Sequence, residues 1–143
     1  MSKNKNKDMA EKIRLLCKSV GPAKQTMTVA RKDIEALNQK LSQSTTDRMK
    51  SMIQGAIEKR EHEIEKAESI VYYFMNIVDG LDREERNLMM QLYLKGKKWS
   101  EVESLDGSQM NASEVNTIYK RALRRMVMNT ERMGIMANML EDL

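Results

Sequence analysis

The chain has 143 residues, a formal net charge of +4, 32% charged residues and only 4% aromatic residues, with a single proline. This composition favours long, solvated helices over a strand-rich core, so we expect an all-α protein. The length fits one domain, or a small domain with an extended arm. A net charge of +4 is also common among proteins without a nucleic-acid partner, so charge alone indicates no function.

The residue types exclude several classes of site. The single cysteine, Cys17, cannot form an intramolecular disulfide, and with the single histidine, His62, it cannot supply the ligands of a zinc site. We expect Cys17 to pack among apolar neighbours and His62 to lie on a solvated helix face. The chain has no nucleophile–base pair, glycine-rich phosphate loop or inward carboxylate pair, so we expect no enzyme, no metal and no cofactor. Its apolar stretches are too short to span a bilayer, which predicts a cytoplasmic protein without membrane contact.

The first 80 residues are expected to form a helical arm. Residues 1–7 hold lysine and asparagine but no apolar core, so we expect a disordered basic tail. A short amphipathic helix follows, which Gly21 and Pro22 should interrupt or end. Apolar residues then recur at heptad spacing on both sides of a polar run at 42–47, where turn and capping residues gather. The heptad positions are Ala23, Met27, Ala30, Ile34, Leu37 and Leu41, then Ile53, Ile57, Ile64, Ala67, Val71, Phe74 and Val78.

Two such helices joined by a short loop should fold back as an antiparallel coiled-coil hairpin. Further apolar residues at Met52, Ala56, Ile70 and Ile77 widen the apolar stripe, so a third helix or a second subunit should also pack on it. We therefore predict that residues 1–80 are an oligomerisation arm and that the chain forms a homodimer through this hairpin.

Residues 81–143 predict a helix-turn-helix module with a C-terminal helix. Its first helix should begin with acidic residues after the Asp79-Gly80 dipeptide and end near Lys95, before Gly96. The spacing of Ser100 and Glu103 matches a capping box that would start a short second helix. We expect this second helix to be buried through Val102 and Leu105.

A third, longer helix is predicted after Asn111, which is the expected N-cap and has Glu114 at the third position. Its buried face should consist of Val115, Ile118, Ala122 and Met126. In a helix-turn-helix, the last helix enters a major groove of DNA while the preceding helices brace it against the backbone.

The outward face of the third helix carries short or hydrogen-bonding residues early and cations late. Early residues would reach base edges and late cations would lie along phosphates, so we expect Asn116 to be the main base-reading residue. Two lysines before the second helix would meet either phosphate or water, and Trp99 is expected to pack in the small core. The full set of predicted DNA-binding residues is Lys97, Lys98, Ser113, Asn116, Thr117, Lys120, Arg121 and Arg124.

Two stretches carry a family resemblance: LMMQLYLKGKKWSEV at 88–102 and VNTIYKRAL at 115–123. They resemble the C-terminal module of the ArpU/RinA-like phage and prophage regulators, which is similar to sigma-factor region 4 and follows a helical arm. The resemblance covers about residues 78–126, and residues 106–110 make the last connection longer than in a tight helix-turn-helix. It implies control of late phage genes inside the bacterial host, by activation rather than repression, with double-stranded DNA and host RNA polymerase as partners.

Two other functions are open at this point. Small terminase subunits of phages also combine a DNA-binding module with helical oligomerisation, so a DNA-packaging component is the first alternative. The second is a helical interaction protein that does not bind DNA, in which Lys120, Arg121 and Arg124 only keep the surface soluble. The methionine-rich segment after Met126 is expected to continue as helix, either packed on the hairpin or free for a partner.

Overall fold

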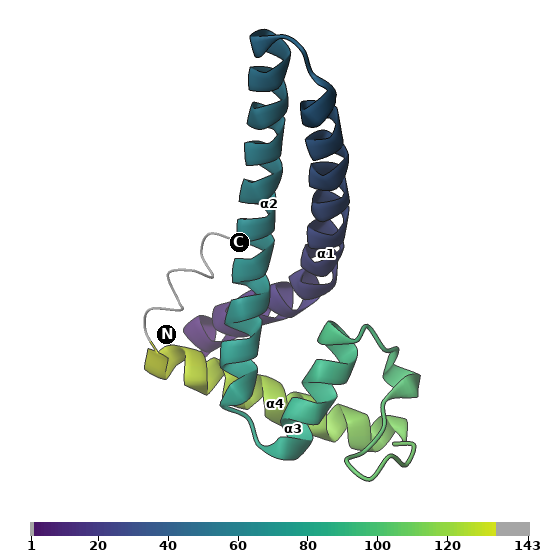
Figure 1. Cartoon of the computed structure of the whole chain (residues 1–143). Helices are drawn as coiled ribbons and strands as arrows, with labels where there is room; N and C mark the ends of the chain where they lie inside the picture. The colour runs from purple at the N-terminus through teal and green to yellow at the C-terminus, as the bar shows by residue number, and fades with distance from the viewer. Residues whose placement is uncertain (1, 134–143) are drawn as a thin grey trace. The chain divides into compact units, whose positions relative to one another are not determined.

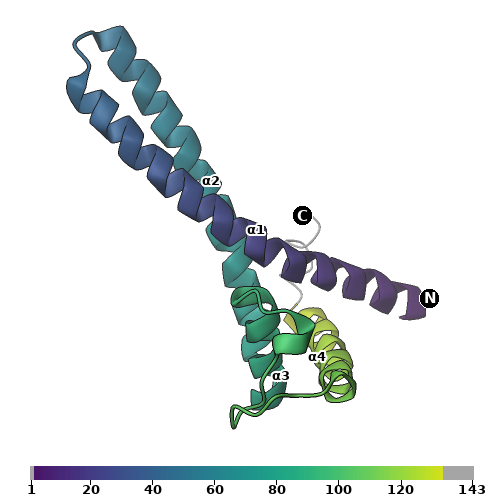
Figure 2. The same cartoon turned by 90° about the vertical axis from the view of Figure 1, so that its right-hand side faces the viewer.

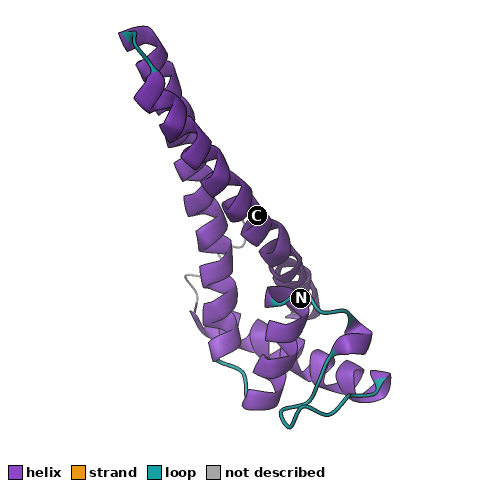
Figure 3. Cartoon of the chain, turned by 45° about the vertical axis from the view of Figure 1, so that its right-hand side comes forward, coloured by secondary structure: helices purple, strands orange, loops and turns teal. Residues whose placement is uncertain are grey.

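The structure, a computed structural model, describes residues 2–133, and side chains for residues 7–131. This part of the chain is helical and holds no β-strand, which confirms the expected all-α class (Figure 3). The elements are α1 (Ser2–Gln43), α2 (Asp47–Asp79), α3 (Arg83–Met89), the π-helical turn η1 (Met90–Leu94), the 3-10 turn η2 (Trp99–Glu101) and α4 (Ala112–Met133). Most of the methionine-rich segment, from Gly134 onward, lies outside the described residues.

Helix α1 is continuous from Ser2 to Gln43, so two expectations for this region were wrong. Residues 2–7 are helical rather than disordered, because a helix already formed farther along gains one backbone hydrogen bond for each residue added. Pro22 lies inside the helix, although an interior proline costs about 3 kcal/mol. Buried apolar residues on both sides, such as Val20 and Ala23, offset that cost.

The chain divides into two compact units. One unit is Pro22–Val71, and the other combines Met1–Gly21 with Tyr72–Leu143. The predicted boundary at residue 80 differs from this division. The N-terminal turns of α1 and the last turns of α2 belong with the C-terminal half of the chain.

Within the unit Pro22–Val71, α1 and α2 run antiparallel side by side (Figures 1 and 2). The connection begins α2 with a side-chain cap, because the backbone N–H of Met49 donates to Oγ1 of Thr46 at 3.3 Å. Arg60 pairs with Asp33 at 3.3 Å across the two helices. A second cross-helix ion pair joins Arg31 and Glu68 at 3.6 Å.

The same unit buries few side chains, and those are small. Its only buried side chains are the three alanines Ala23, Ala30 and Ala67. The large aliphatic residues at the heptad positions are only half-buried, and Met49 and Met52 are 52% and 68% exposed. His62, as expected, is solvated, with 81% of its side chain exposed. The helix pair therefore lacks a core of large side chains.

The other unit contains the larger core. Its fully buried side chains come from the N-terminal part of α1, the end of α2, α3 and α4. The largest are Ile13, Leu16, Phe74, Ile77, Leu88, Met89 and Met126. Cys17 is also buried, as expected. A separate small cluster joins Leu88, Val102, Met110, Val115 and Ile118.

The expected short second helix at about 100–105 is absent, which corrects that prediction. Only the three residues of η2 are helical, and the chain then turns back on itself through an isolated bridge between Glu103 and Gln109. Val102 is buried as expected, but Leu105 is 56% exposed.

Side-chain hydrogen bonds explain this turn. The carboxylate of Asp106 accepts from the hydroxyls of Ser104 and Ser108, and Gly107 has a φ of +85°. Short polar side chains that bond locally compete with helix formation. The helix-capping glutamate is also displaced by two residues, since Glu101 rather than Glu103 accepts the cap N–H, that of Lys98, at 2.9 Å.

Candidate nucleic-acid interface on α4

Helix α4 begins at the N-cap residue predicted from sequence, Asn111. The backbone N–H of Glu114 donates to Oδ1 of Asn111 at 2.9 Å. In return, Nδ2 of Asn111 donates to the carboxylate of Glu114 at 2.6 Å. The buried face is also the predicted one, with Val115, Ile118, Ala122 and Met126 all at most 5% exposed. These two features fix where α4 starts and which side of it faces solvent.

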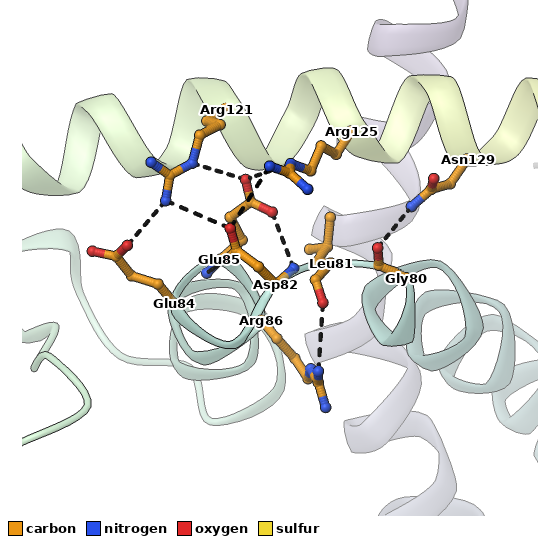
Figure 4. A network of polar contacts seen from close by, with 9 residues as sticks. All are labelled: Gly80, Leu81, Asp82, Glu84, Glu85, Arg86, Arg121, Arg125 and Asn129. Carbon is orange, nitrogen blue, oxygen red and sulfur yellow. Dashed lines mark hydrogen bonds and ion pairs between the residues drawn. The ribbon is translucent and has the colours of Figure 1, made fainter.

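A buried carboxylate ties α4 to α3 (Figure 4). The side chain of Glu85 is 0% exposed; its Oε2 accepts from Nε of Arg121 at 2.9 Å and forms an ion pair with Nε of Arg125 at 3.1 Å. Its Oε1 accepts the backbone N–H of Asp82 at 3.2 Å, and Oδ1 of Asp82 accepts the backbone N–H of Glu85 at 2.9 Å. Glu85 therefore completes the N-terminal cap of α3 and anchors two arginines of α4.

Arg121 is surrounded by acidic groups. In addition to Glu85, it donates from Nη2 to Glu84 at 3.0 Å and lies 3.8 Å from Asp82. Hydrogen bonds to Glu84 and Glu85 raise the pKa of Arg121 further above its ordinary value. The positive charge of this predicted DNA-binding residue is thus compensated inside the chain.

A backbone contact adds a third attachment between α4 and the preceding segment. Nδ2 of Asn129 donates to the carbonyl oxygen of Gly80 at 3.2 Å. A Cβ atom at position 80 would lie 2.5 Å from that same Nδ2 atom. Any larger residue at position 80 would require the side chain of Asn129 to shift, so the Asp79-Gly80 dipeptide has a packing role beyond ending α2.

Five of the eight predicted site residues form one exposed strip along α4, at helical spacings of three and four residues. We call Ser113, Asn116, Thr117, Lys120 and Arg124 the outer strip. The hydroxyl of Thr117 donates back to the carbonyl oxygen of Ser113 at 2.9 Å. Among residues 7–131, whose side chains the structure describes, Lys120 and Arg124 form no ion pair, so the outer strip carries two positive charges that no described acidic group compensates.

The remaining predicted residues lie elsewhere. Arg121 is on the edge of α4 that faces Glu84 and Glu85, outside the outer strip. Lys97 is half-buried, and its Nζ donates to Oε1 of Gln91 at 3.2 Å. Lys98 is exposed at the start of η2.

Sequence reasoning missed the acidic anchor. Glu85 occupies a position of the apolar face of α3, four residues after Leu81 and three before Leu88, both of which are buried. A glutamate at an apolar position requires a cationic partner, because burying an unpaired charge is costly. That spacing was the available signal, and Arg125 was the partner that the sequence analysis did not consider.

Three observations complete the description of the site. In the described part of the chain, three or more histidine, cysteine or acidic side chains never gather as a metal site would require. Of the helices described, none combines the length and apolar character of a membrane span. Comparisons of the chain with protein-family models, curated proteins and solved structures found no match.

Proposed function

We propose that this chain is a non-enzymatic protein that binds double-stranded DNA by placing the outer strip of α4 in the major groove. The observation that carries the proposal is the difference between the paired and the solvent-facing cations on α4. Arg121 and Arg125 are held by Glu85, whereas Lys120 and Arg124 face solvent beside hydrogen-bonding side chains. A rigid helix that presents amide, hydroxyl and cationic groups on one face suits base-edge and phosphate contacts.

The strip assigns different tasks along the helix. Asn116 can make a two-point contact with adenine, and such a contact contributes about 1 to 3 kcal/mol of discrimination against the wrong base. Lys120 and Arg124, one and two turns later, would neutralise phosphates, which supplies affinity that depends on salt. In this proposal Arg121 acts as a positioning residue, because its guanidinium already has acidic partners.

We further propose that the DNA-binding module is a variant helix-turn-helix of a phage or prophage transcriptional regulator, acting in the bacterial host cytoplasm. This rests on the resemblance of residues 88–102 and 115–123 to the ArpU/RinA-like group. In this chain the bracing would come from α3 and the short turn η2 rather than from a full second helix. Activation through contact with host RNA polymerase is the mode that the resemblance favours.

The Pro22–Val71 helix pair is, in this proposal, a coiled-coil hairpin that joins two copies of the chain. Its half-buried aliphatic residues and its exposed methionines leave apolar surface that a single hairpin cannot cover. A second copy would cover it, and two-fold symmetry would present two α4 helices to half-sites about one helical turn of DNA apart.

The test is fluorescence anisotropy with labelled promoter fragments at several salt concentrations. The Lys120→Gln, Arg124→Gln double variant should weaken binding and lower the slope of log K against log salt by about 2. Its matched control is the Lys40→Gln, Arg48→Gln variant, which makes the same change in charge at exposed positions of the other unit and should bind as the native chain does.

Two outcomes would favour the alternatives. If the native chain shows no salt-dependent binding, or if the double variant binds as tightly as the native chain, the outer strip is excluded as the DNA-binding surface. A protein-interaction role would then be favoured. Binding together with assembly into a ring of many subunits would favour a DNA-packaging component.

A further inference from the structure

Trp99 is the only tryptophan of the chain and is partly exposed. Its ring packs edge-on against Tyr119 of α4, with centroids 5.0 Å apart and an interplanar angle of 62°. The hydroxyl of Tyr119 lies 2.7 Å from that of Tyr93. The indole is therefore held in a fixed position against α4, yet 37% of the residue remains open to solvent.

The neighbours of Trp99 hold its backbone in place. The backbone N–H of Glu101 donates to the carbonyl oxygen of Lys98 at 2.9 Å, and the carboxylate of Glu101 accepts the N–H of Lys98 at 2.9 Å. The side-chain amide of Gln109 donates to the carbonyl oxygen of Ser100. These hydrogen bonds use the N–H groups of Lys98 and Glu101 and the carbonyl oxygens of Lys98 and Ser100, and they hold the turn in place.

Two donors of this turn bear on a ligand. Among residues 7–131, whose side chains the structure describes, the indole N–H of Trp99 forms no hydrogen bond and the ammonium of Lys98 forms no ion pair. An indole N–H usually takes a hydrogen-bond partner where the ring becomes covered, as it would be against a ligand. An adjacent indole N–H and ammonium, both free, match the oxygens of a phosphate diester.

The position of Trp99 relates this turn to the outer strip. Tyr119, on which the indole packs, lies one helical turn after Asn116 and next to Lys120 in the sequence. Residues three apart are neighbours on a helix surface. The indole is therefore placed beside the Asn116 edge of the outer strip, at the border of the surface that would face the groove.

We propose that Trp99 and Lys98 form a second contact with duplex DNA, on the sugar–phosphate backbone that borders the groove entered by α4. This inference rests on the proposed DNA-binding function. The indole N–H and the ammonium of Lys98 donate to phosphate oxygens, and the indole ring covers the neighbouring deoxyribose. The turn fixes the height of α4 in the groove, a role that the outer strip alone does not supply.

The native full chain provides the first test, because all tryptophan fluorescence comes from Trp99. A labelled duplex and the tryptophan emission are followed in one titration, and acrylamide quenching is measured with and without saturating DNA. We expect the emission to change with the same midpoint as the anisotropy of the duplex. Acrylamide quenching should fall severalfold in the complex because the indole becomes covered.

A variant isolates the hydrogen bond. Trp99→Phe keeps an aromatic ring on Tyr119 but removes the N–H donor, so affinity should fall about tenfold or more, as expected for a hydrogen bond to a charged group. Lys98→Gln should lower the salt slope by about 1. Tyr72→Phe, which also removes one polar hydrogen from an exposed aromatic residue of the same unit, is the matched control and should bind normally.

The outcomes separate the two proposals. Tight, salt-dependent binding with unchanged quenching of Trp99 and unchanged affinity of Trp99→Phe would overturn the backbone contact and leave the role of α4 intact. If the native chain shows no salt-dependent anisotropy change with the duplex, both the backbone contact and the DNA-binding role of α4 are overturned. If Trp99→Phe unfolds, as judged by circular dichroism, the quenching of the native chain still decides.

Discussion

Nε of Arg121 donates to Oε2 of Glu85 at 2.9 Å, across 36 residues of sequence, and the carboxylate is fully buried while the arginine side chain is 41% exposed. This pair changes how mutations on α4 must be interpreted. An arginine that looks like a phosphate contact in the sequence is part of the attachment between two helices. Removing this arginine therefore tests the stability of the fold before it tests the proposed binding of DNA.

The pair predicts an asymmetric effect on stability. Replacing Arg121 and Arg125 together by glutamine leaves Glu85 buried without a cation, and should cost about 3 kcal/mol in the free energy of unfolding, the lower end of the usual range because the arginines are partly exposed. Glu85→Gln should cost less, since its freed arginines can reach water. Urea denaturation measures both.

A variant that combines all three substitutions is the control for these stability measurements. Adding Glu85→Gln to the double arginine variant should restore part of the lost stability, because the unpaired buried charge is gone. An additive loss in the triple variant would show that the carboxylate is not the origin of the effect.

Two glycines should respond to alanine in opposite directions. Gly80→Ala places a methyl group 2.5 Å from Nδ2 of Asn129, and should destabilise the chain by about 1 to 3 kcal/mol. At Gly55, inside α2, a new methyl group has no atom within 4 Å apart from the adjacent residues and the backbone of the helix itself, so Gly55→Ala should stabilise the chain by about 0.5 to 1 kcal/mol. Thermal unfolding compares the two, and Asn129→Ala in the Gly80→Ala background should recover part of the loss.

We expect acid to open the turn at residues 104–108 only at a pH well below the ordinary pKa of an aspartate. Hydrogen bonds from Ser104 and Ser108 lower the pKa of Asp106 from 3.8 to about 2. Because the folded-state pKa is depressed, the stabilisation is complete above pH 3.8 and is lost as the pH falls through about 2. An NMR titration of the Ser108 amide should show this midpoint, and a midpoint near 3.8 would contradict the turn geometry.

The thiol of Cys17 should be unreactive in the native chain. Burial raises its pKa to about 12, so almost no thiolate is present at neutral pH. Labelling with a chromogenic disulfide reagent at pH 8 should therefore be slow, and should accelerate with urea in parallel with unfolding. Rapid stoichiometric labelling without urea would show that the N-terminal part of α1 detaches from its unit.

The exposed methionines predict how self-association can be weakened. Met52 is 68% exposed in the single chain, so Met52→Lys should leave the unfolding of a monomer unchanged. In a hairpin dimer the buried lysine should raise the dissociation constant about tenfold or more. Sedimentation equilibrium measures this, with Gln54→Lys, at another exposed position of α2, as control. A native chain that sediments as a monomer at all concentrations would refute the dimer.

Local chemistry accounts for what could be predicted from the sequence. The Asn111 N-cap and the buried series from Val115 to Met126 depend only on residues within a few turns, and both were confirmed. Gly96 also has the positive φ, +69°, expected of a residue that ends a helix.

Of the predictions that were wrong or missed, one has a local cause and one a long-range cause. The second helix was lost to the hydrogen bonds of Asp106, which compete with a capping pattern at Ser100 and Glu103. The pairing of Arg121 with Glu85 joins distant residues, and no helical period relates them. The assignment of DNA contacts on the outer strip stays a prediction that only binding measurements test.

The two roles of Glu85 should make the opening of α3 and the release of α4 cooperative. Because one carboxylate closes the first turn of α3 and also holds two arginines of α4, fraying of that turn releases both arginines in the same event. The amide protons at the start of α3 and those around residues 121–125 should then exchange with solvent through one shared opening. The polar attachment of α4, and with it the direction of the proposed DNA-binding strip, would thus loosen whenever this single turn of α3 opens, leaving the apolar face of α4 and the Asn129–Gly80 contact to hold the helix.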